Sequence, residues 1–318
     1  MKCLVTATGS MSAEVVITHL ALLPDVEIIG CNMHPAAWTP ASRLVQRFHQ
    51  VPSAKEETAY LVRLLQICQV ERISHVIALT DPEVDVLSLH REKFAALGVV
   101  LCIPPHPAVQ TARDKLEMYR RFANHPRIRP ITTTDLRDIG FMAFSGPLLG
   151  KPRSGRSSEG QVYIPDAAAL QFWGERLAGQ DYVVQPLHTG NVMVVDVVRH
   201  PDGQTVAMTR QELLRTTNGA GMTVRMQPGH ICDVLAQEVA DNLGMHGCIN
   251  VEFLMVNDAP LLMDINPRFS AGVAFSIMAG YDMVANHLRC FSDKNLESCS
   301  APPNSVYARG FIEYSLQD

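Results

Sequence analysis

The stretch LLMDINPRFS at residues 261–270 carries side chains that could bind a metal ion and a phosphate. After an apolar start, an acid, an amide and a guanidinium follow at alternate positions, as Asp264, Asn266 and Arg268. Because side chains alternate across a β-strand, the acid and the amide would share one face. Carboxylate and amide oxygens suit Mg²⁺, and a following guanidinium could neutralise a phosphoryl group.

A second apolar run, at residues 248–256, precedes this stretch and predicts an antiparallel hairpin with its turn near residues 257–259. With a three-residue loop, Glu252 lies opposite Asp264. Opposed carboxylates destabilise a hairpin unless a cation joins them, so the pattern predicts a Mg²⁺ site with Asn266 as the third ligand. The alternative is a solvated hairpin face whose acids meet water. The expected core face consists of Val251, Phe253, Met255, Leu261, Met263 and Ile265.

A lysine followed by a glycine- and serine-rich segment could hold the phosphates of a nucleotide. Lys151 ends an apolar run and opens KPRSGRSSEG, residues 151–160. Backbone and hydroxyl donors in such a loop can point at a phosphate together, and the lysine adds a point charge. The segment does not match the P-loop pattern, because the lysine precedes the glycines. Taken alone, it also fits an ordinary surface loop.

The composition is that of a folded globular protein. Of 318 residues, 47% are hydrophobic and 19% charged, and the net charge of −5 argues against a nucleic-acid partner. Eight cysteines without a CxxC pair, mostly in apolar runs, predict reduced and buried thiols in the cytoplasm. No apolar run reaches the roughly 18 residues that span a bilayer. Polar residues also break the N-terminal run before a signal-peptide core could form. We therefore expect a cytoplasmic protein without a membrane partner.

The chain begins with alternating strand and helix patterns, which indicate a doubly wound parallel α/β domain. Four strands are expected from apolar runs at residues 2–7, 26–32, 73–80 and 99–105. The prolines of PPHP suggest a domain boundary near residue 108.

Beyond this boundary the pattern changes to mixed helices and antiparallel hairpins. Helices are expected at residues 112–125, 166–179 and 231–244, with a short one beginning at 135–140. Strands are expected at residues 146–152 and 181–187, and strand–turn–strand patterns at 191–214 and 248–268.

The order of these pieces resembles the ATP-grasp superfamily, in particular its carboxylate–amine ligase and carbamoyl-phosphate-synthase large-subunit-like branch. The resemblance covers roughly the whole chain and is most specific where NVEF precedes DINPRFSAG. It also includes DK at 114–115, KPRSGRSSEG and VVQPLHTGN. It implies an α/β (α+β ATP-grasp) fold, with a pre-ATP-grasp domain at residues 1–108, a small lobe with a phosphate-lid loop at 109–187 and a C-terminal lobe with the metal site at 188–318.

The resemblance also implies where ATP binds. Lys115 and Lys151 would contact the phosphates, although Lys115 alone reads as a solvated helix charge. The lid would be formed by Ser154, Gly155, Ser157, Ser158 and Gly160. The adenine and ribose side would be formed by Gln185, Pro186, Leu187 and Asn191.

For the chemistry, the resemblance implies that Glu252, Asp264 and Asn266 hold Mg²⁺ and that Arg268 and Lys151 stabilise the transferred phosphoryl group. Three positions differ from the usual family residue, which is often Glu: Gln185, Asn191 and Asp264. None of these changes removes an essential charge, since Asp264 still offers a carboxylate to Mg²⁺.

The expected reaction phosphorylates a carboxylic acid to an acyl phosphate, which an amine then attacks. Arg210 and Arg215 are candidates for binding the substrate acid, because arginine binds carboxylates in a bidentate way, or they are two exposed charges. The expected partners are small carboxylic acids and amines, amino acids or peptides among them, and the resemblance is compatible with a homodimer.

Three other functions stay open at this point. One is a nucleotide-binding sensor or scaffold without turnover. Another is a carbamoyl-phosphate-synthase-like fragment that acts on bicarbonate or carbamate. The third, a dehydrogenase built on the N-terminal domain, lacks the GxGxxG fingerprint.

Overall fold

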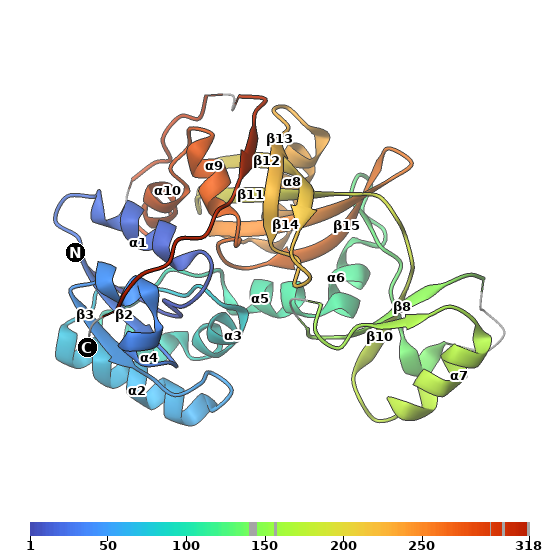
Figure 1. Cartoon of the computed structure of the whole chain (residues 1–318), viewed down its shortest axis with the longest axis horizontal. Coiled ribbons are helices and arrows are strands. Elements are labelled where there is room, and N and C mark those ends of the chain that lie inside the picture. The colour runs from blue at the N-terminus through green and yellow to red at the C-terminus, as the bar shows by residue number, and fades with distance from the viewer. Residues whose placement is uncertain (140–144, 156–157, 293, 301–302, 317–318) are drawn as a thin grey trace.

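The computed structural model describes residues 1–139, 145–155, 158–292, 294–300 and 303–316, and it contains three β-sheets (Figure 1). The N-terminal sheet with its helices and a small sheet with one helix lie at opposite ends of the long axis. The large sheet lies between and above them. The expected α/β class is confirmed. The domain limits at residues 108 and 187 stay a prediction.

The N-terminal sheet is parallel, with the strand order β3-β2-β1-β4-β5. Its strands are β1 (Lys2–Val5), β2 (Glu27–Asn32), β3 (Arg47–Gln50), β4 (His75–Ile77) and β5 (Val100–Leu101). The four expected strands are confirmed. The sequence analysis did not find β3, because RFHQ is a polar segment at the edge of the sheet and has no apolar run to reveal it.

Helices cover both faces of this sheet, as a doubly wound domain requires. They are α1 (Ala13–Ala21), α2 (Glu57–Glu71), α3 (Asp81–Leu89) and α4 (Arg91–Ala95), with the 3-10 helices η1 (Ala36–Trp38) and η2 (Pro40–Leu44). Val5 points into a cluster with α1, whereas its neighbour Leu4 points into a cluster with α2. This alternation follows from the two-residue period of a strand.

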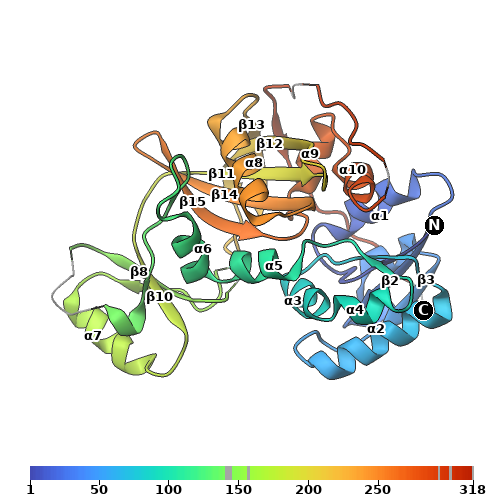
Figure 2. The same ribbon diagram turned by 180° about the vertical axis from the view of Figure 1, so that it is seen from behind.

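The helix expected over residues 112–125 is wrong as a single element, because the chain forms α5 (His106–Arg113) and α6 (Lys115–Phe122). Asp114 separates them in an extended conformation, and its side chain accepts hydrogen bonds from the backbone N–H groups of Leu116 and Glu117, both at 3.0 Å. A carboxylate that caps the next helix in this way competes with continuation of the first. Figure 2 shows α5 and α6 running from the N-terminal sheet toward the small sheet.

The small sheet is antiparallel, with the order β7-β10-β8-β9. It contains β7 (Thr134–Asp135), β8 (Leu148–Pro152), β9 (Val162–Ile164) and β10 (Tyr182–Pro186). Helix α7 (Ala167–Arg176) packs against it through a separate core that includes Ile164 and Leu170. The short helix expected from residue 135 is the 3-10 helix η3 (Leu136–Asp138), and Gly140 lies outside the described residues.

The large sheet has the order β16-β13-β12-β11-β14-β15-β6, and all its neighbours are antiparallel except β15 and β6. Its strands are β6 (Arg129–Pro130), β11 (Asn191–Arg199), β12 (Thr205–Arg215), β13 (Gly221–Met226), β14 (Gly247–Val256), β15 (Ala259–Asn266) and β16 (Val306–Ala308). The associated helices are α8 (Ile231–Leu243), α9 (Val273–Met278) and α10 (Met283–Arg289).

The two faces of the large sheet have different neighbours. Val195 and Val197 on β11 pack with α8 in one core cluster. Val198 on the opposite face belongs to a cluster that also contains Ile17 of α1 and Met283 of α10. The N-terminal domain and the large sheet therefore share one hydrophobic core, whereas the small sheet has its own.

Two expectations from the composition can be compared with the structure. Each of the eight cysteines is a free thiol, and all but Cys299 are buried, which confirms the expected burial. Within the described ranges, no helix combines the length and the apolar character needed to cross a membrane.

Candidate functional site

A cavity of about 470 Å³ lies where the three sheets meet. The N-terminal domain contributes residues 10–12 and 79–81 to its wall, and the segments around β8 and the large sheet contribute most of the rest. Many residues singled out from the sequence line it, namely Lys115, Lys151, Gly155, Ser158, Arg210, Arg215, Glu252, Asp264, Asn266 and Arg268. Residues far apart in the chain are thus brought together, as the sequence analysis requires.

The registers of the large sheet explain why its polar side chains converge. In one row across the sheet, Arg210 is paired with Val194, Val194 with Glu252, and Glu252 with Asp264. The next row contains Asn250 opposite Asn266. Both rows face the cavity rather than α8, because side chains of a strand alternate between the faces.

The predicted opposition of Glu252 and Asp264 is confirmed, but the turn is different. Val256 pairs with Ala259, so the loop contains only Asn257 and Asp258, both with positive φ. A register shift next to Glu252 then adds one residue to the opposite strand and restores the pairing.

This bulge overturns part of the expected core face. Met263 lines the cavity, and Leu261 is only half-buried. Leu262 takes their place in the core, fully buried opposite Phe253. The extra residue reverses the alternation on β15, which a pattern with strict period two does not reveal.

The carboxylates at the hairpin have unequal surroundings. Glu252 accepts a hydrogen bond at 3.0 Å from Nη2 of Arg215. Burial raises the pKa of Glu252, with a further contribution from the Asp264 charge, against the opposing effect of Arg215. The side chain of Asp264 has no hydrogen bond or ion pair to any residue that the structure describes. A cation between the two would relieve their repulsion.

The third expected ligand, Asn266, is held by a residue that the sequence analysis missed. Nδ2 of Asn266 donates to Oδ1 of buried Asn250 at 3.0 Å, which orients the amide oxygen of Asn266 toward the guanidinium of Arg268 at 3.2 Å. Asn250 lies two residues before Glu252, and this spacing was the available signal. The set offers two carboxylates and an amide oxygen, which fits Mg²⁺ with phosphate or water oxygens as its other ligands. Among the described residues, no group of three or more His, Cys, Asp or Glu forms an alternative metal site.

Arg268 reaches into the N-terminal domain. Its Nε and Nη2 donate to the carboxylate of Asp81 at 2.9 and 2.8 Å. Burial opposes the charged form, but the carboxylates of Asp81, Asp264 and Glu252 together outweigh it and the pKa of Arg268 is raised. The expected role of Arg268 at the phosphoryl group stays a prediction, and in this structure its bidentate partner is Asp81.

Two lysines lie on the opposite side of the cavity. Burial lowers the pKa of Lys151 and the charge of Lys115 lowers it further, while Asp264 and Glu252 act in the other direction. Nζ of Lys115 donates to the carbonyl oxygen of Gly155 at 3.2 Å. The charges of Asp264 and Glu252, the two acids expected to bind the metal, thus act directly on Lys151.

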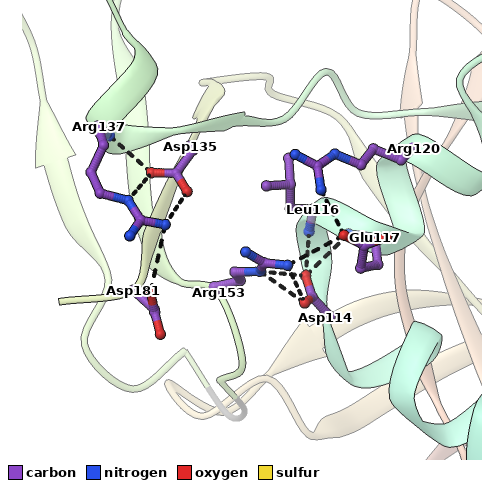
Figure 3. A network of polar contacts seen from close by, with 8 residues as sticks. All are labelled: Asp114, Leu116, Glu117, Arg120, Asp135, Arg137, Arg153 and Asp181. Atoms are coloured by element: carbon purple, nitrogen blue, oxygen red, sulfur yellow. Dashed lines mark hydrogen bonds and ion pairs between the residues drawn. The ribbon is translucent and has the colours of Figure 1, made fainter.

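A network of ion pairs joins the residue after β8 to the start of α6 (Figure 3). Arg153, directly after β8, donates from Nε to both oxygens of Asp114 at 2.8 Å and lies 3.3 Å from Oε1 of Glu117. The backbone N–H of Lys115 donates to the carbonyl oxygen of Arg153 at 3.1 Å. Burial alone would raise the pKa of Asp114, but Arg153 and the helix N–H groups hold it below its ordinary value. The residue that precedes the expected lid segment is therefore bonded to the start of α6.

The other residues of the expected lid are divided between two neighbouring cavities. Ser154, Gly155 and Gly160 line a second cavity of about 350 Å³ beside the first, and Ser158 lines the first. Ser157 lies outside the described residues.

The expected adenine-binding residues line neither of these two cavities. Nε2 of buried Gln185 donates to Oγ1 of Thr133 at 2.9 Å, and the backbone N–H of Leu187 donates to the carbonyl oxygen of Pro147 at 2.9 Å. Pro186 has no N–H, and Asn191 is exposed at the start of β11. Their roles toward adenine and ribose stay predictions.

Of the two arginines expected to bind the substrate acid, Arg210 is 1% exposed. Its Nη1 donates to Asp196 at 2.6 Å, its Nη2 to Ser270 at 3.1 Å and its Nε to Glu212 at 3.3 Å. Arg215 is half-buried and contacts Glu252 and the carbonyl oxygen of Gly219. Glu212, which the sequence analysis missed, lines the cavity with both arginines. Its place two residues after Arg210 on β12 was the signal.

Two family models match separate parts of the chain. Residues 3–102 match the model described as PylC-like, N-terminal domain. Residues 179–309 match the model described as ATP-grasp in the biosynthetic pathway with Ter operon. The curated protein "formate-dependent phosphoribosylglycinamide formyltransferase" of Synechococcus sp. (strain CC9605) is 22% identical over 302 residues, which are 89% of this chain and 73% of that protein.

Solved structures resemble nearly the whole chain. N5-carboxyaminoimidazole synthetase from Staphylococcus aureus, complexed with ADP, has a TM-score of 0.74 at 16% identity and covers 96% of this chain and 79% of its own. The biotin carboxylase domain of Hydrogenobacter thermophilus 2-oxoglutarate carboxylase, in complex with MgADP, ADP and bicarbonate, has a TM-score of 0.77 at 12% identity. It covers 96% of this chain and 73% of its own. These likenesses confirm the ATP-grasp fold that the sequence motifs suggested.

Proposed function

Because this chain carries an ATP-grasp fold behind a PylC-like N-terminal domain, we propose that it is an ADP-forming, Mg²⁺-dependent ligase. It activates a carboxylic acid as an acyl phosphate and transfers the acyl group to an amine. Solved relatives contain ADP or MgADP, which supports ATP and Mg²⁺ as the nucleotide and metal of this chain.

The observation that carries this proposal is the pairing of Glu252 with Asp264 on the cavity wall. Two opposed carboxylates are a cost to the hairpin unless a cation binds them. Lys151 lies close enough for both charges to act on its pKa. This charge arrangement suits a metal ion on one side of a phosphate chain and a lysine on the other.

We assign the following tasks to the residues of the site. Glu252, Asp264 and Asn266 hold Mg²⁺, which when bound supplies positive charge to the phosphate oxygens. Lys115 and Lys151 bind and orient the phosphates. In addition, the adenine and ribose contacts are assigned to Gln185, Pro186, Leu187 and Asn191.

The reaction needs no side-chain nucleophile. An oxygen of the substrate carboxylate attacks the γ-phosphorus, the bond to the β-phosphate oxygen breaks, and ADP leaves. The nitrogen of the amine then attacks the acyl carbon, the carbon–oxygen bond breaks, and phosphate leaves while the nitrogen releases a proton. The protein's contribution is to hold anions together and to exclude water.

We further propose a cytoplasmic location and small-molecule substrates. The free thiols of the described cysteines support the location. The curated relative uses formate, and one solved relative holds bicarbonate, so small carboxylates are the acids to try first.

The test is ADP and phosphate release with Mg²⁺, ATP, pooled small carboxylic acids that include formate and bicarbonate, and pooled amino acids as amines. We expect one combination of pools to release ADP and phosphate in equal amounts. Release of AMP and pyrophosphate would show adenylation and contradict the acyl-phosphate mechanism. Binding of MgADP without turnover in any pool would favour a sensor, and no binding would refute the nucleotide site.

A further inference from the structure

We propose that the carboxylate of Glu212 binds the ammonium group of the amine substrate. The side chain of Glu212 is 2% exposed and lines the same cavity as the expected metal ligands. Its Oε2 is buried and has no hydrogen-bond partner among the described residues. This inference rests on the proposed function, because it assigns a place to the second substrate of that reaction.

The charges around Glu212 support a cationic ligand. Arg210 lies between two carboxylates, with Nη1 2.6 Å from Asp196 and Nε 3.3 Å from Glu212. These three side chains are at most 2% exposed and together carry one negative charge. Asp196 has the shorter contact and also accepts from Oγ of Ser276 at 2.7 Å. Each of the two carboxylates has one buried oxygen without a hydrogen-bond partner among the described residues, Oδ1 of Asp196 and Oε2 of Glu212, but of the two only Glu212 lines the cavity. A buried negative charge there favours a cation beside it.

No neighbouring guanidinium satisfies Oε2. Arg215, whose charge also acts on Glu212, donates to Glu252 and to the carbonyl oxygen of Gly219. Arg309 donates to the carbonyl oxygen of Ala271. Both cations are engaged elsewhere, so Oε2 keeps its capacity to accept a hydrogen bond.

The position of Glu212 suits the nucleophile of the proposed reaction. Its charge acts on Glu252, one of the expected metal ligands, so the two carboxylates belong to neighbouring parts of one cavity. An amine held at Glu212 would thus lie next to the phosphate end of the site. A primary ammonium has three donors and can use one for Oε2, and transfer of that proton to Oε2 frees the lone pair that attacks the acyl carbon.

Gly221 forms the wall against which this carboxylate rests. A Cβ at Gly221 would lie 2.2 Å from Oε2 of Glu212, closer than atoms can approach. Gly221 also lines the cavity. The substitution Gly221→Ala should therefore displace the carboxylate without changing the charge of the protein, and it provides a second variant beside Glu212→Gln.

The experiment measures binding of the amides of the common amino acids to the full chain with MgADP, by saturation-transfer NMR. These probes have an ammonium group and no carboxylate, and their N-acetylated forms serve as uncharged controls. We expect at least one amide to bind, its acetylated form not to bind, and Glu212→Gln to weaken binding at least about tenfold. Gly221→Ala should weaken it as well, whereas Glu175→Gln, the same change on exposed α7, should not.

Failure of the inference is distinguishable from failure of the proposed function. Equal amide binding by wild type and Glu212→Gln, or no amide binding by the wild type, would overturn the role of Glu212. Both variants should keep MgADP affinity and a single cooperative unfolding transition, although at a lower temperature, which shows that the fold and nucleotide site are intact. Absence of ADP formation, with amide binding that depends on Glu212, would overturn the ligase reaction and leave the ammonium site standing.

Discussion

At the scale of single residues, the site is built from charges that do not balance locally. The side chain of Asp264 has no hydrogen bond or ion pair within the described part of the chain, and that of Glu252 has Arg215. Opposed carboxylates of this kind lower the stability of the hairpin until a cation arrives. The paired carboxylates that would bind a cation at this hairpin therefore lower its stability when no cation is bound.

Asp264→Asn should lower the rate of Mg²⁺-dependent ADP formation by roughly a hundredfold or more, because it removes a charged group that we assign to the metal ion. The fold should be retained or slightly stabilised, since the change also removes repulsion with Glu252. ADP release and thermal unfolding measure the two effects. Asp258→Asn, the same change at the exposed turn of the hairpin, is the control and should have little effect. Undiminished turnover in Asp264→Asn would refute the metal site.

Arg268→Ala should lower the free energy of unfolding by roughly 1–3 kcal/mol, because Asp81 loses its bidentate partner. Urea unfolding measures this change. Arg225→Ala, at an exposed position of β13, is the matched control and should be nearly neutral. If Arg268→Ala is as stable as the control, the contact with Asp81 does not contribute to the fold.

At the scale of elements, short connections between segments position the two lysines that we assign to the phosphates. The capping residue Asp114 satisfies the first turn of α6 and at the same time binds Arg153 at the end of β8. Lys115 directly follows Asp114 in the sequence, and Lys151 lies two residues before Arg153. One ion pair thus sets the distance between two elements that carry the lysines.

Arg153→Gln should weaken MgADP binding by roughly tenfold, because the end of β8 is released from α6 and the lysines lose their fixed spacing. Calorimetry of MgADP binding measures this. Arg120→Gln on the same helix also breaks an ion pair with Glu117, but it lies on the exposed side and should change the affinity less than about twofold. Equal effects of the two variants would contradict the positioning role.

The small sheet should show a defined acid dependence. Arg137 lowers the pKa of Asp135 on β7 to about 2. Because this pKa is depressed on folding, the ion pair contributes stability above the ordinary value of 3.8 and loses it as the pH falls toward 2. Arg137→Gln should therefore be less stable than wild type at pH 6, with a difference that shrinks below pH about 4.

Urea titrations at several pH values between these limits measure the difference. Asp135→Asn serves as the control, since Arg137→Gln added to it should show no such pH dependence. A difference that stays constant across the range would mean that the Asp135–Arg137 pair is not its source.

At the scale of the whole molecule, the three sheets are not equivalent. The cluster around Val5, Ile17, Met208 and Met283 joins the N-terminal domain to the large sheet, whereas the small sheet packs on α7 through its own small cluster. We therefore expect the first two to unfold as one unit, and the small sheet to open separately over the cavity.

Ile17→Ala should destabilise both the N-terminal domain and the large sheet by about 2–5 kcal/mol, because Ile17 is fully buried in their shared cluster. Hydrogen exchange should accelerate in β1 and in β11 together, with little change in β10. Ile164→Ala in the core of the small sheet is the counterpart and should accelerate exchange in β8–β10 alone. Acceleration confined to β1 in Ile17→Ala would show that the two parts unfold independently.

The sequence alone determined the class of the fold and offered the residues that we assign to the metal ion. The four apolar strands of the N-terminal domain follow from local periodicity, which acts over short segments. The opposition of Glu252 to Asp264 was expected correctly, but from a three-residue turn, whereas in the structure a bulge on β15 restores it. The break at Asp114 and the polar strand β3 were not expected from the sequence. A capping side chain and a polar edge strand both interrupt the apolar pattern from which helices and strands are predicted.

Only the tertiary structure decided which distant residues meet. No local pattern connects Arg268 with Asp81, Arg210 with Asp196, or Glu212 with the wall at Gly221, since these contacts arise when sheets and loops pack across the cavity. The bulge at Met263 belongs here too, because a single inserted residue restores the register of the metal ligands while reversing the faces beyond it. Burial and strand register are set only in the folded chain, and together they leave the Oε2 of Glu212 buried without a hydrogen-bond partner among the described residues.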